Sequence, residues 1–231
     1  MDNISTDSGK RVAQKIGFKE VRSYKNEATV KITKEEFLES NRGKRKNVAI
    51  LLYEGIDMGC YSVIHDLLIM ANSINEEVLF DIHSINSKGN VIASNDVSMK
   101  VKRVDMWEKN ADIIFLIHGT NIDEEIKDKE KIRYIMSNLE NCDYICANGE
   151  ALRFLVRCRA VDGVFIPEKQ SLMIKNEGIE DNVLLQKNYV DNGKIMLSAN
   201  IIGQIQLVLA LIEKVGGRGL SRKVAKNIGL E

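Results

Sequence analysis

Four side chains that could do chemistry follow apolar runs in this sequence: Asp57, Cys60, His118 and Cys146. If the runs are parallel strands, their carboxyl ends meet at one edge of a sheet, where sites form in open α/β folds. Residues 55–60, 118–121 and 146–149 would then lie together. Because a thiolate is a strong nucleophile, this pattern predicts a site for thiol chemistry or small-molecule binding at that edge.

The elements that would position these residues alternate along the chain. Continuous apolar runs suit strands buried on both faces, and apolar residues at helical spacing separate them. The expected strands are 48–53, 78–85, 113–117 and 144–146, and the expected helices are 62–74, 123–139, 149–156, 201–215 and 220–228. Gly89 and Asn90 predict a hairpin from the second strand into 91–93, and residues 191–193 predict a turn between two short strands. This order predicts a doubly wound, mostly parallel sheet with helices on both faces.

Composition excludes several classes of protein. The 231 residues carry 33 basic and 33 acidic side chains, so net charge gives no reason to expect nucleic acid or an anionic membrane as a partner. No apolar run reaches the roughly 20 residues of a membrane helix, and residues 2–10 are too polar for a signal peptide. The four cysteines show neither CxxC nor zinc spacing. We therefore expect a cytoplasmic protein with reduced thiols and without a metal or other cofactor.

The first 46 residues differ from the rest and predict a separate α+β appendage. They contain a short amphipathic helix at 8–16, a candidate hairpin at 19–33 and a charged linker at 34–46. Residues 7–21 (DSGKRVAQKIGFKEV) resemble the closing helix and strand of GNAT acetyltransferases, although the acetyl-CoA loop of that fold is missing. The expected division is an appendage at 1–46 and a main domain at 47–231.

Four segments of the main domain resemble the ThiJ/PfpI superfamily, which has the flavodoxin-like fold of class I glutamine amidotransferases. They are 48–57 (VAILLYEGID), 111–120 (ADIIFLIHGT), 144–152 (YICANGEAL) and 189–199 (YVDNGKIMLSA) followed by the apolar helix at 205–212. The superfamily includes isocyanide hydratases, protein deglycases and the sensor domains of some AraC-type regulators. The resemblance implies a homodimer that acts on or binds a small molecule.

The resemblance also assigns roles to particular residues. Cys146 falls where the superfamily keeps a nucleophile on a tight strand-to-helix turn, with a helix start beside the sulfur that favours the thiolate. Backbone N–H groups around Gly119, Thr120 and Ala147 would hold an oxyanion or a carboxylate. The alternative is a purely structural role, in which Cys146 is a small buried residue at the end of a core strand.

The sequence departs from the superfamily pattern at the same site. Asn148 replaces a glycine after the nucleophile, with Gly149 next, and a second register would match residues 147–149 and remove the nucleophile. The carboxylate that usually contacts the cysteine falls at Cys60, and Asp57 is a nearby substitute. A downstream histidine falls at Ile166. His118 replaces a proline and is either an alternative base or a loop histidine bonded to the backbone.

Two functions therefore remain open from the sequence. The first is a cysteine-dependent hydrolase, hydratase or deglycase-like enzyme acting through Cys146. The second is a non-enzymatic ligand-binding or redox-sensing module, in which Cys60 and Cys146 could form a disulfide. No helix-turn-helix follows the last predicted helix, so we expect no DNA binding by the chain itself.

Overall fold

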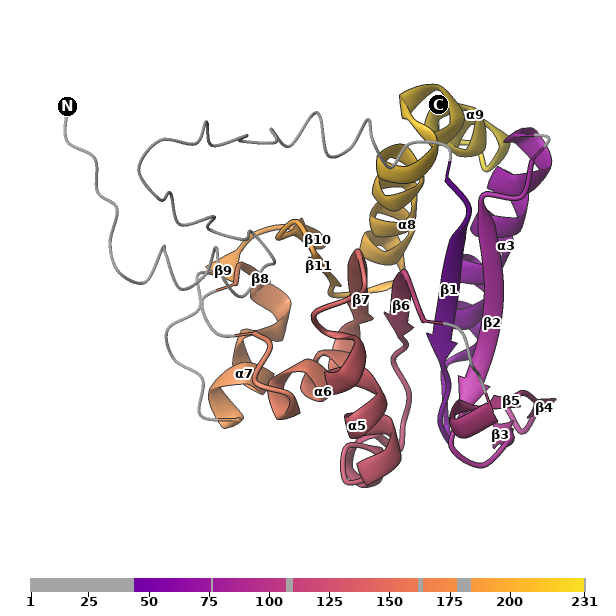
Figure 1. Cartoon of the computed structure of the whole chain (residues 1–231). Helices are drawn as coiled ribbons and strands as arrows, with labels where there is room; N and C mark the ends of the chain where they lie inside the picture. Colours follow the sequence, from indigo (N-terminus) through magenta and orange to yellow (C-terminus); the bar gives the residue numbers. More distant parts are fainter. Residues whose placement is uncertain (1–43, 76, 107–109, 162–163, 178–183, 231) are drawn as a thin grey trace, which may run out of the picture.

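The computed structural model describes residues 44–75, 77–106, 110–161, 164–177 and 184–230 (Figure 1). Residues 1–43 of the predicted 1–46 appendage, including its acetyltransferase-like segment, lie outside the described residues. None of the helices in the described part is long and apolar enough to cross a membrane.

A seven-stranded sheet organises the described chain, with strand order β10-β11-β7-β6-β1-β2-β5. All neighbouring strands pair in parallel except β10 and β11, which are antiparallel. The strands are β1 (Lys46–Leu51), β2 (Phe80–Asn86), β5 (Lys102–Arg103), β6 (Ile113–Leu116), β7 (Tyr144–Asn148), β10 (Tyr189–Asp191) and β11 (Ile195–Ser198). The central runs of β1 and β6 are almost fully buried, which explains their continuous apolar sequence.

The connections place helices on both faces of this sheet, as predicted. The chain moves from β1 to β2 toward one edge and from β6 to β7 toward the other. Because such crossovers are right-handed, their helices lie on opposite faces. The helix α8 packs on α3 and α9, so these three share a face (Figure 1). The helices are α3 (Met58–Asn75), α4 (Ile122–Glu125), α5 (Lys129–Asn138), α6 (Leu152–Arg157), α7 (Ser171–Asn176), α8 (Ile201–Gly216) and α9 (Arg218–Asn227), with short 3₁₀ turns η1 (Val104–Met106), η2 (Gly149–Ala151) and η3 (Glu168–Gln170).

The predicted helix at 123–139 is two helices, because Asp128 interrupts it. Asp128 has extended backbone angles (φ −67°, ψ 107°), and its side chain accepts the N–H groups of Glu130 and Lys131. An aspartate in this position caps a new helix start and stops continuation of the preceding one. The result is the short α4 followed by α5.

The turn prediction at 191–193 is confirmed, and the hairpin prediction after the second strand is wrong. Gly193 has a φ of +86°, and its N–H donates to Asp191 Oδ1 at 2.8 Å between β10 and β11. The segment after Gly89 forms β3 (Asn90–Ile92), which pairs with β4 (Ser98–Lys100) and not with β2. The free edge of β2 pairs with β5 instead. A second small sheet joins β8 (Ile166–Pro167) and β9 (Leu184–Leu185).

The topological switch point lies between β1 and β6, where the chain turns toward opposite edges of the sheet. Beyond these two strands, Ile56 and Gly119 form an isolated antiparallel bridge that ties the two following loops together. Crevices at such a point are the usual binding sites of open α/β sheets. The fold therefore brings the residues of interest to one end of the sheet.

Candidate functional site

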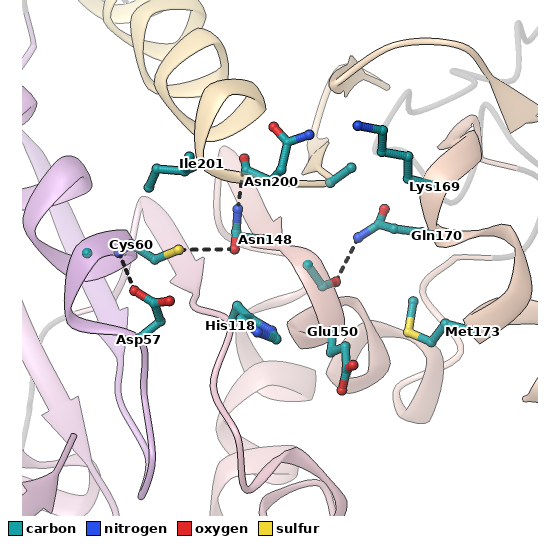
Figure 2. Close-up of a pocket in the computed structure, with 13 residues that line it drawn as sticks. Asp57, Cys60, His118, Asn148, Glu150, Lys169, Gln170, Met173, Asn200 and Ile201 are labelled. Carbon is teal, nitrogen blue, oxygen red and sulfur yellow. Dashed lines mark hydrogen bonds between the residues drawn. The ribbon is translucent and has the colours of Figure 1, made fainter. Parts of the chain in front are cut away.

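A pocket of about 590 Å³ lies at the carboxyl ends of β6, β7 and β11, beside the loop that follows β1 (Figure 2). This volume is within the range of about 300–1,000 Å³ that is usual for small-molecule sites. The lining residues come from five places in the chain: Asp57, Gly59 and Cys60; His118; Asn148, Gly149 and Glu150; Lys169, Gln170 and Met173; and Ala199, Asn200 and Ile201.

Asp57 and Cys60 line the pocket from the start of α3. Asp57 Oδ1 accepts the backbone N–H of Cys60 at 2.9 Å, and the carbonyl of Asp57 accepts the N–H of Tyr61. Asp57 is therefore the N-cap of α3, which fixes its carboxylate at the pocket edge. Its own N–H donates to the carbonyl of His118 at 2.9 Å and links this loop to the end of β6.

Asn148, the last residue of β7, connects three elements beneath the pocket. Its Oδ1 accepts the Cys60 thiol at 3.5 Å, and its Nδ2 donates to Ser198 Oγ at 3.0 Å and to the carbonyl of Asn200 at 3.4 Å. The Asn148 side chain is buried, so these bonds satisfy an amide that would otherwise be costly to bury. Asn148 is thus a structural part of the pocket floor.

The strand-to-helix turn after β7 has Gly149 as its left-handed residue. Gly149 has a φ of +54°, whereas Asn148 is still extended (φ −111°, ψ 135°). A Cβ at Gly149 would lie 3.2 Å from His118 Cγ and Nδ1. The position from which a turn nucleophile would project is therefore occupied by a glycine, with His118 facing it.

Cys146 is not at this turn, and the prediction of an exposed thiol there is wrong. The strand β7 is paired on both edges beyond Cys146, which lies opposite Phe115 of β6 and Met196 of β11. Its side chain is 1% exposed and does not line the pocket. Burial raises the pKa of the Cys146 thiol well above its usual value, where a helix start was expected to lower it. The second register, which puts Ala147 in the nucleophile position, does not match the turn either, because Ala147 also lies within the paired part of β7.

Neither a disulfide nor an electrostatic interaction links Cys60 to Cys146. Both are free thiols. Beyond burial, the groups that act on the pKa of Cys146 are Asp191, Cys142 and Lys214, whereas Asp57 acts on Cys60. Cys60 lines the pocket and Cys146 does not, so the geometry gives no support to a disulfide between them.

The predicted oxyanion donors do not face the pocket. The N–H of Thr120 donates to the carbonyl of Gly55 at 2.9 Å, and Gly119 takes part in the bridge to Ile56. A Cβ at Gly119 would lie 2.7 Å from the carbonyl oxygen of Gly55. Ala147 is 1% exposed within the paired part of β7. These three residues hold the strands and loops in place, because their backbones are already used in pairing.

His118 lines the pocket, but Cys146 does not share that lining, so His118 is not placed as its base. Among the described residues, Nδ1 of His118 is buried without a hydrogen-bond partner. Of the predicted site residues, the structure thus brings together Asp57, Cys60, His118 and Asn148.

Gln170 is a pocket residue that the sequence analysis missed. Its Nε2 donates to the carbonyl of Gly149 at 2.7 Å and to that of Ser198 at 3.4 Å. Its Oε1 is buried and has no partner in the described part of the chain. No motif around 168–173 signals this role, because the segment approaches β7 only in the folded chain.

Asn200, Ile201 and Lys169 were also missed. Asn200 caps α8, and its side chain accepts the N–H of Gly203 at 2.9 Å. An asparagine before a long apolar helix is a recognisable start signal, so this residue could have been found. Lys169 is exposed at the pocket edge and makes no ion pair with any described residue. The described residues contain no cluster of three or more His, Cys, Asp or Glu that could hold a metal ion.

Neither a protein-family model nor a curated protein sequence matches this chain. Solved structures do match it along most of its length. A ThiJ/PfpI family protein from Pseudomonas syringae superposes with a TM-score of 0.69 at 10% identity, covering 89% of this chain and 83% of its own. An AraC family transcriptional regulator from Pseudomonas putida gives 0.66 at 16% identity, covering 80% and 100%. DJ-1beta from Drosophila melanogaster gives 0.65 at 16% identity, covering 81% and 99%.

These likenesses define the fold class. The chain has the α/β fold shared by the ThiJ/PfpI and DJ-1 proteins and by the matched part of an AraC family regulator. The predicted fold is confirmed, and the predicted catalytic use of Cys146 receives no support from its position.

Proposed function

We propose that this chain binds a small molecule in the pocket between the starts of α3 and α8, without a covalent intermediate on a cysteine at the β7 turn. The observation that carries this proposal is the identity of the turn residue. Gly149 has the left-handed backbone and no side chain, while Cys146 is buried three residues earlier in the sheet.

The pocket thiol also favours binding over thiol catalysis. Burial and the nearby negative charge of Asp57 raise the pKa of Cys60 to about 12. The Cys60 thiol donates to Asn148 and is protonated near neutral pH. Since the thiolate is the nucleophilic form, Cys60 is suited to supporting the pocket floor.

The likeness to an AraC family transcriptional regulator favours a regulatory role for this chain. By this likeness, the chain would change its stability or its association with a partner when a metabolite occupies the pocket. We retain homodimer formation as an expectation from the resemblance of the sequence to the ThiJ/PfpI superfamily. The rival function is a cysteine-dependent hydrolase, which requires a reactive thiol at Cys60 or Cys146.

A metabolite screen with a matched pair of variants tests the proposal. Ile201 lines the pocket, whereas Ile69 of α3 has a similar exposure (44% against 40%) and does not. In a thermal-shift screen of a few hundred polar metabolites, we expect at least one compound to raise the Tm of the wild type and of Ile69→Trp. The same compound should have no effect on Ile201→Trp, whose indole would fill the pocket mouth.

Two kinds of result would contradict the proposal. No stabilising compound at millimolar concentration, or equal stabilisation of both tryptophan variants, would argue against binding in this pocket. Hydrolysis of p-nitrophenyl acetate that is lost in Cys146→Ala or Cys60→Ala, with a covalent acyl adduct on that cysteine by mass spectrometry, would establish the hydrolase instead.

A further inference from the structure

Resting on this proposed function, we infer that the ligand is a small amino acid-like zwitterion. Its carboxylate would lie between Lys169 and the start of α8, and its ammonium group would donate to Gln170 Oε1. Three independent features of the pocket carry this inference: a buried acceptor, a pair of free backbone donors with a lysine, and the balance of charged side chains.

The buried acceptor is Gln170 Oε1. Gln170 is 5% exposed, and both atoms that contact its Nε2 are carbonyl oxygens, of Gly149 and Ser198. Exchanging the two ends of the amide would place oxygen against oxygen, so the observed orientation is the favourable one. Figure 2 shows the free oxygen of Gln170 on the side where Lys169 and Asn200 lie. A buried acceptor without a partner is costly, and a ligand donor would satisfy it.

The free donors are at the start of α8. Gly203 donates its N–H to the Asn200 side chain, and Gln204 donates to the Asn200 carbonyl. The N–H groups of Ile201 and Ile202 have no partner among the described residues. The start of this 16-residue helix therefore carries two free donors and positive potential, which suit a carboxylate. The exposed ammonium of Lys169 adds a full positive charge at the same edge of the pocket.

The charged side chains of the pocket lining indicate which charged groups the ligand has in addition to its carboxylate. The pocket is lined by two carboxylates, Asp57 and Glu150, and one ammonium, Lys169. One oxygen of Asp57 accepts the N–H of Cys60, and the Glu150 side chain is exposed on the turn after β7. The net charge of these three side chains is −1, so a simple anion would be repelled, whereas in a zwitterion the ammonium group offsets the ligand's own carboxylate. The lining therefore disfavours a carboxylate that carries no amine.

Isothermal titration of the wild-type chain with each of the twenty standard L-amino acids tests the inference. We expect at least one to bind with a Kd below about 1 mM, equivalent to about −4 kcal/mol. The amine that lacks its carboxylate and the carboxylic acid that lacks its amine should each bind at least about tenfold more weakly, because each loses a charge-assisted contact.

Two variants and a control test which pocket residue contacts the carboxylate of the ligand and which contacts its amine. Lys169→Met should weaken the best amino acid about tenfold and leave its amine analogue unchanged, since the amine has no carboxylate to lose. Gln170→Met should weaken the amino acid and its amine analogue but not the carboxylic acid. Lys175→Met changes an exposed lysine of α7 that does not line the pocket, and should change none of the three. Thermal melting of each variant establishes that it is folded.

The inference fails if no amino acid binds, if the amine-free acid binds as well as the amino acid, or if Lys169→Met binds like Lys175→Met. These failures differ from failure of the proposed function. A non-amino compound that stabilises the wild type and not Ile201→Trp would retain the pocket as a binding site while overturning the zwitterion. Absence of any pocket ligand would overturn both.

Discussion

The Cys60 thiol donates to the side-chain oxygen of Asn148 at 3.5 Å, joining the start of α3 to the end of β7. The two residues are 88 positions apart in the sequence. Asn148 uses its nitrogen for Ser198, so its amide is held between two elements. Cys60 is therefore a hydrogen-bond donor within the pocket floor. The turn after β7, which follows Asn148, has a glycine and no cysteine.

The thiols should react slowly in the folded protein. Burial raises the pKa of Cys60 to about 12 and those of Cys142 and Cys158 to about 11, and it raises the pKa of Cys146 as well. At pH 7.5 we expect alkylation by iodoacetamide to be at least about 100-fold slower than for a free thiol, because the thiolate fraction falls tenfold per pKa unit. Peptide mass spectrometry of native and urea-unfolded protein measures each site. Rapid native labelling of Cys60 or Cys146 would contradict this expectation.

A side chain at the β7 turn should destabilise the protein. Gly149→Ala places a Cβ at a φ of +54° and 3.2 Å from the His118 ring, so we expect a loss of about 1–2 kcal/mol in the free energy of unfolding. Gly219→Ala is the matched control, because a Cβ there meets no atom within 4 Å in the helix α9. It should be neutral or stabilising by up to about 1 kcal/mol. Urea denaturation distinguishes the two, and equal effects would contradict the strained turn.

Removing the buried cation Lys131 should reduce the free energy of unfolding by more than Gly149→Ala does. Lys131 is 1% exposed, and its Nζ lies 2.5 Å from Glu125 Oε2 and 2.7 Å from Asp128 Oδ2. Lys131→Met leaves these carboxylates without their partner, and we expect a loss of about 3–5 kcal/mol in unfolding free energy. Adding Glu125→Gln should recover part of the loss. A loss below about 1 kcal/mol in the single variant would show that the pair is not needed.

The same cluster predicts a dependence of stability on pH. Burial raises the pKa of Asp128, but hydrogen bonds from Lys131 and Ser87 and the charge of Lys131 outweigh it, so the pKa falls from 3.8 to about 2. A carboxylate with a lowered pKa stabilises the fold above its usual pKa, and this contribution is lost as the pH falls from about 4 through about 2.

Asp128→Asn should therefore be less stable than the wild type at pH 6, and the difference should shrink as the pH falls from 4 to 2. Glu130→Gln, an exposed carboxylate on the same helix, serves as the control and should show no such convergence. Urea denaturation at a series of pH values measures it. A difference between Asp128→Asn and wild type that is constant down to pH 2 would be evidence against the lowered pKa.

Much of the fold could be predicted because its signals are local. The apolar runs at 48–53 and 113–117 coincide with β1 and β6, and the glycine turn at 191–193 lies between β10 and β11. The pairing partner of each strand was harder to predict from the sequence. The segment after Gly89 has a hairpin signal, but its partner is β4, since the edge of β2 pairs with β5.

The sequence predicted several residues that line the pocket, but its prediction for Cys146 was wrong. The sequence places Asp57, Cys60, His118 and Asn148 at strand ends, and parallel strands bring their carboxyl ends together. The length of β7 is not a local property. The strand continues past Cys146 because Ser198 of β11 pairs with Asn148, which moves the turn to Gly149 and buries the sulfur.

By itself, the sequence determined the class of fold and which strand ends would meet, because buried periodicity and glycine turns act over a few residues. The tertiary structure alone decided which side chains face the pocket. Gln170 approaches Gly149 from a segment 21 residues away, and the carbonyl of Asn200 accepts a hydrogen bond from Asn148, 52 residues away. Such contacts depend on the pairing of distant strands and the packing of helix starts, which short-range sequence patterns do not encode.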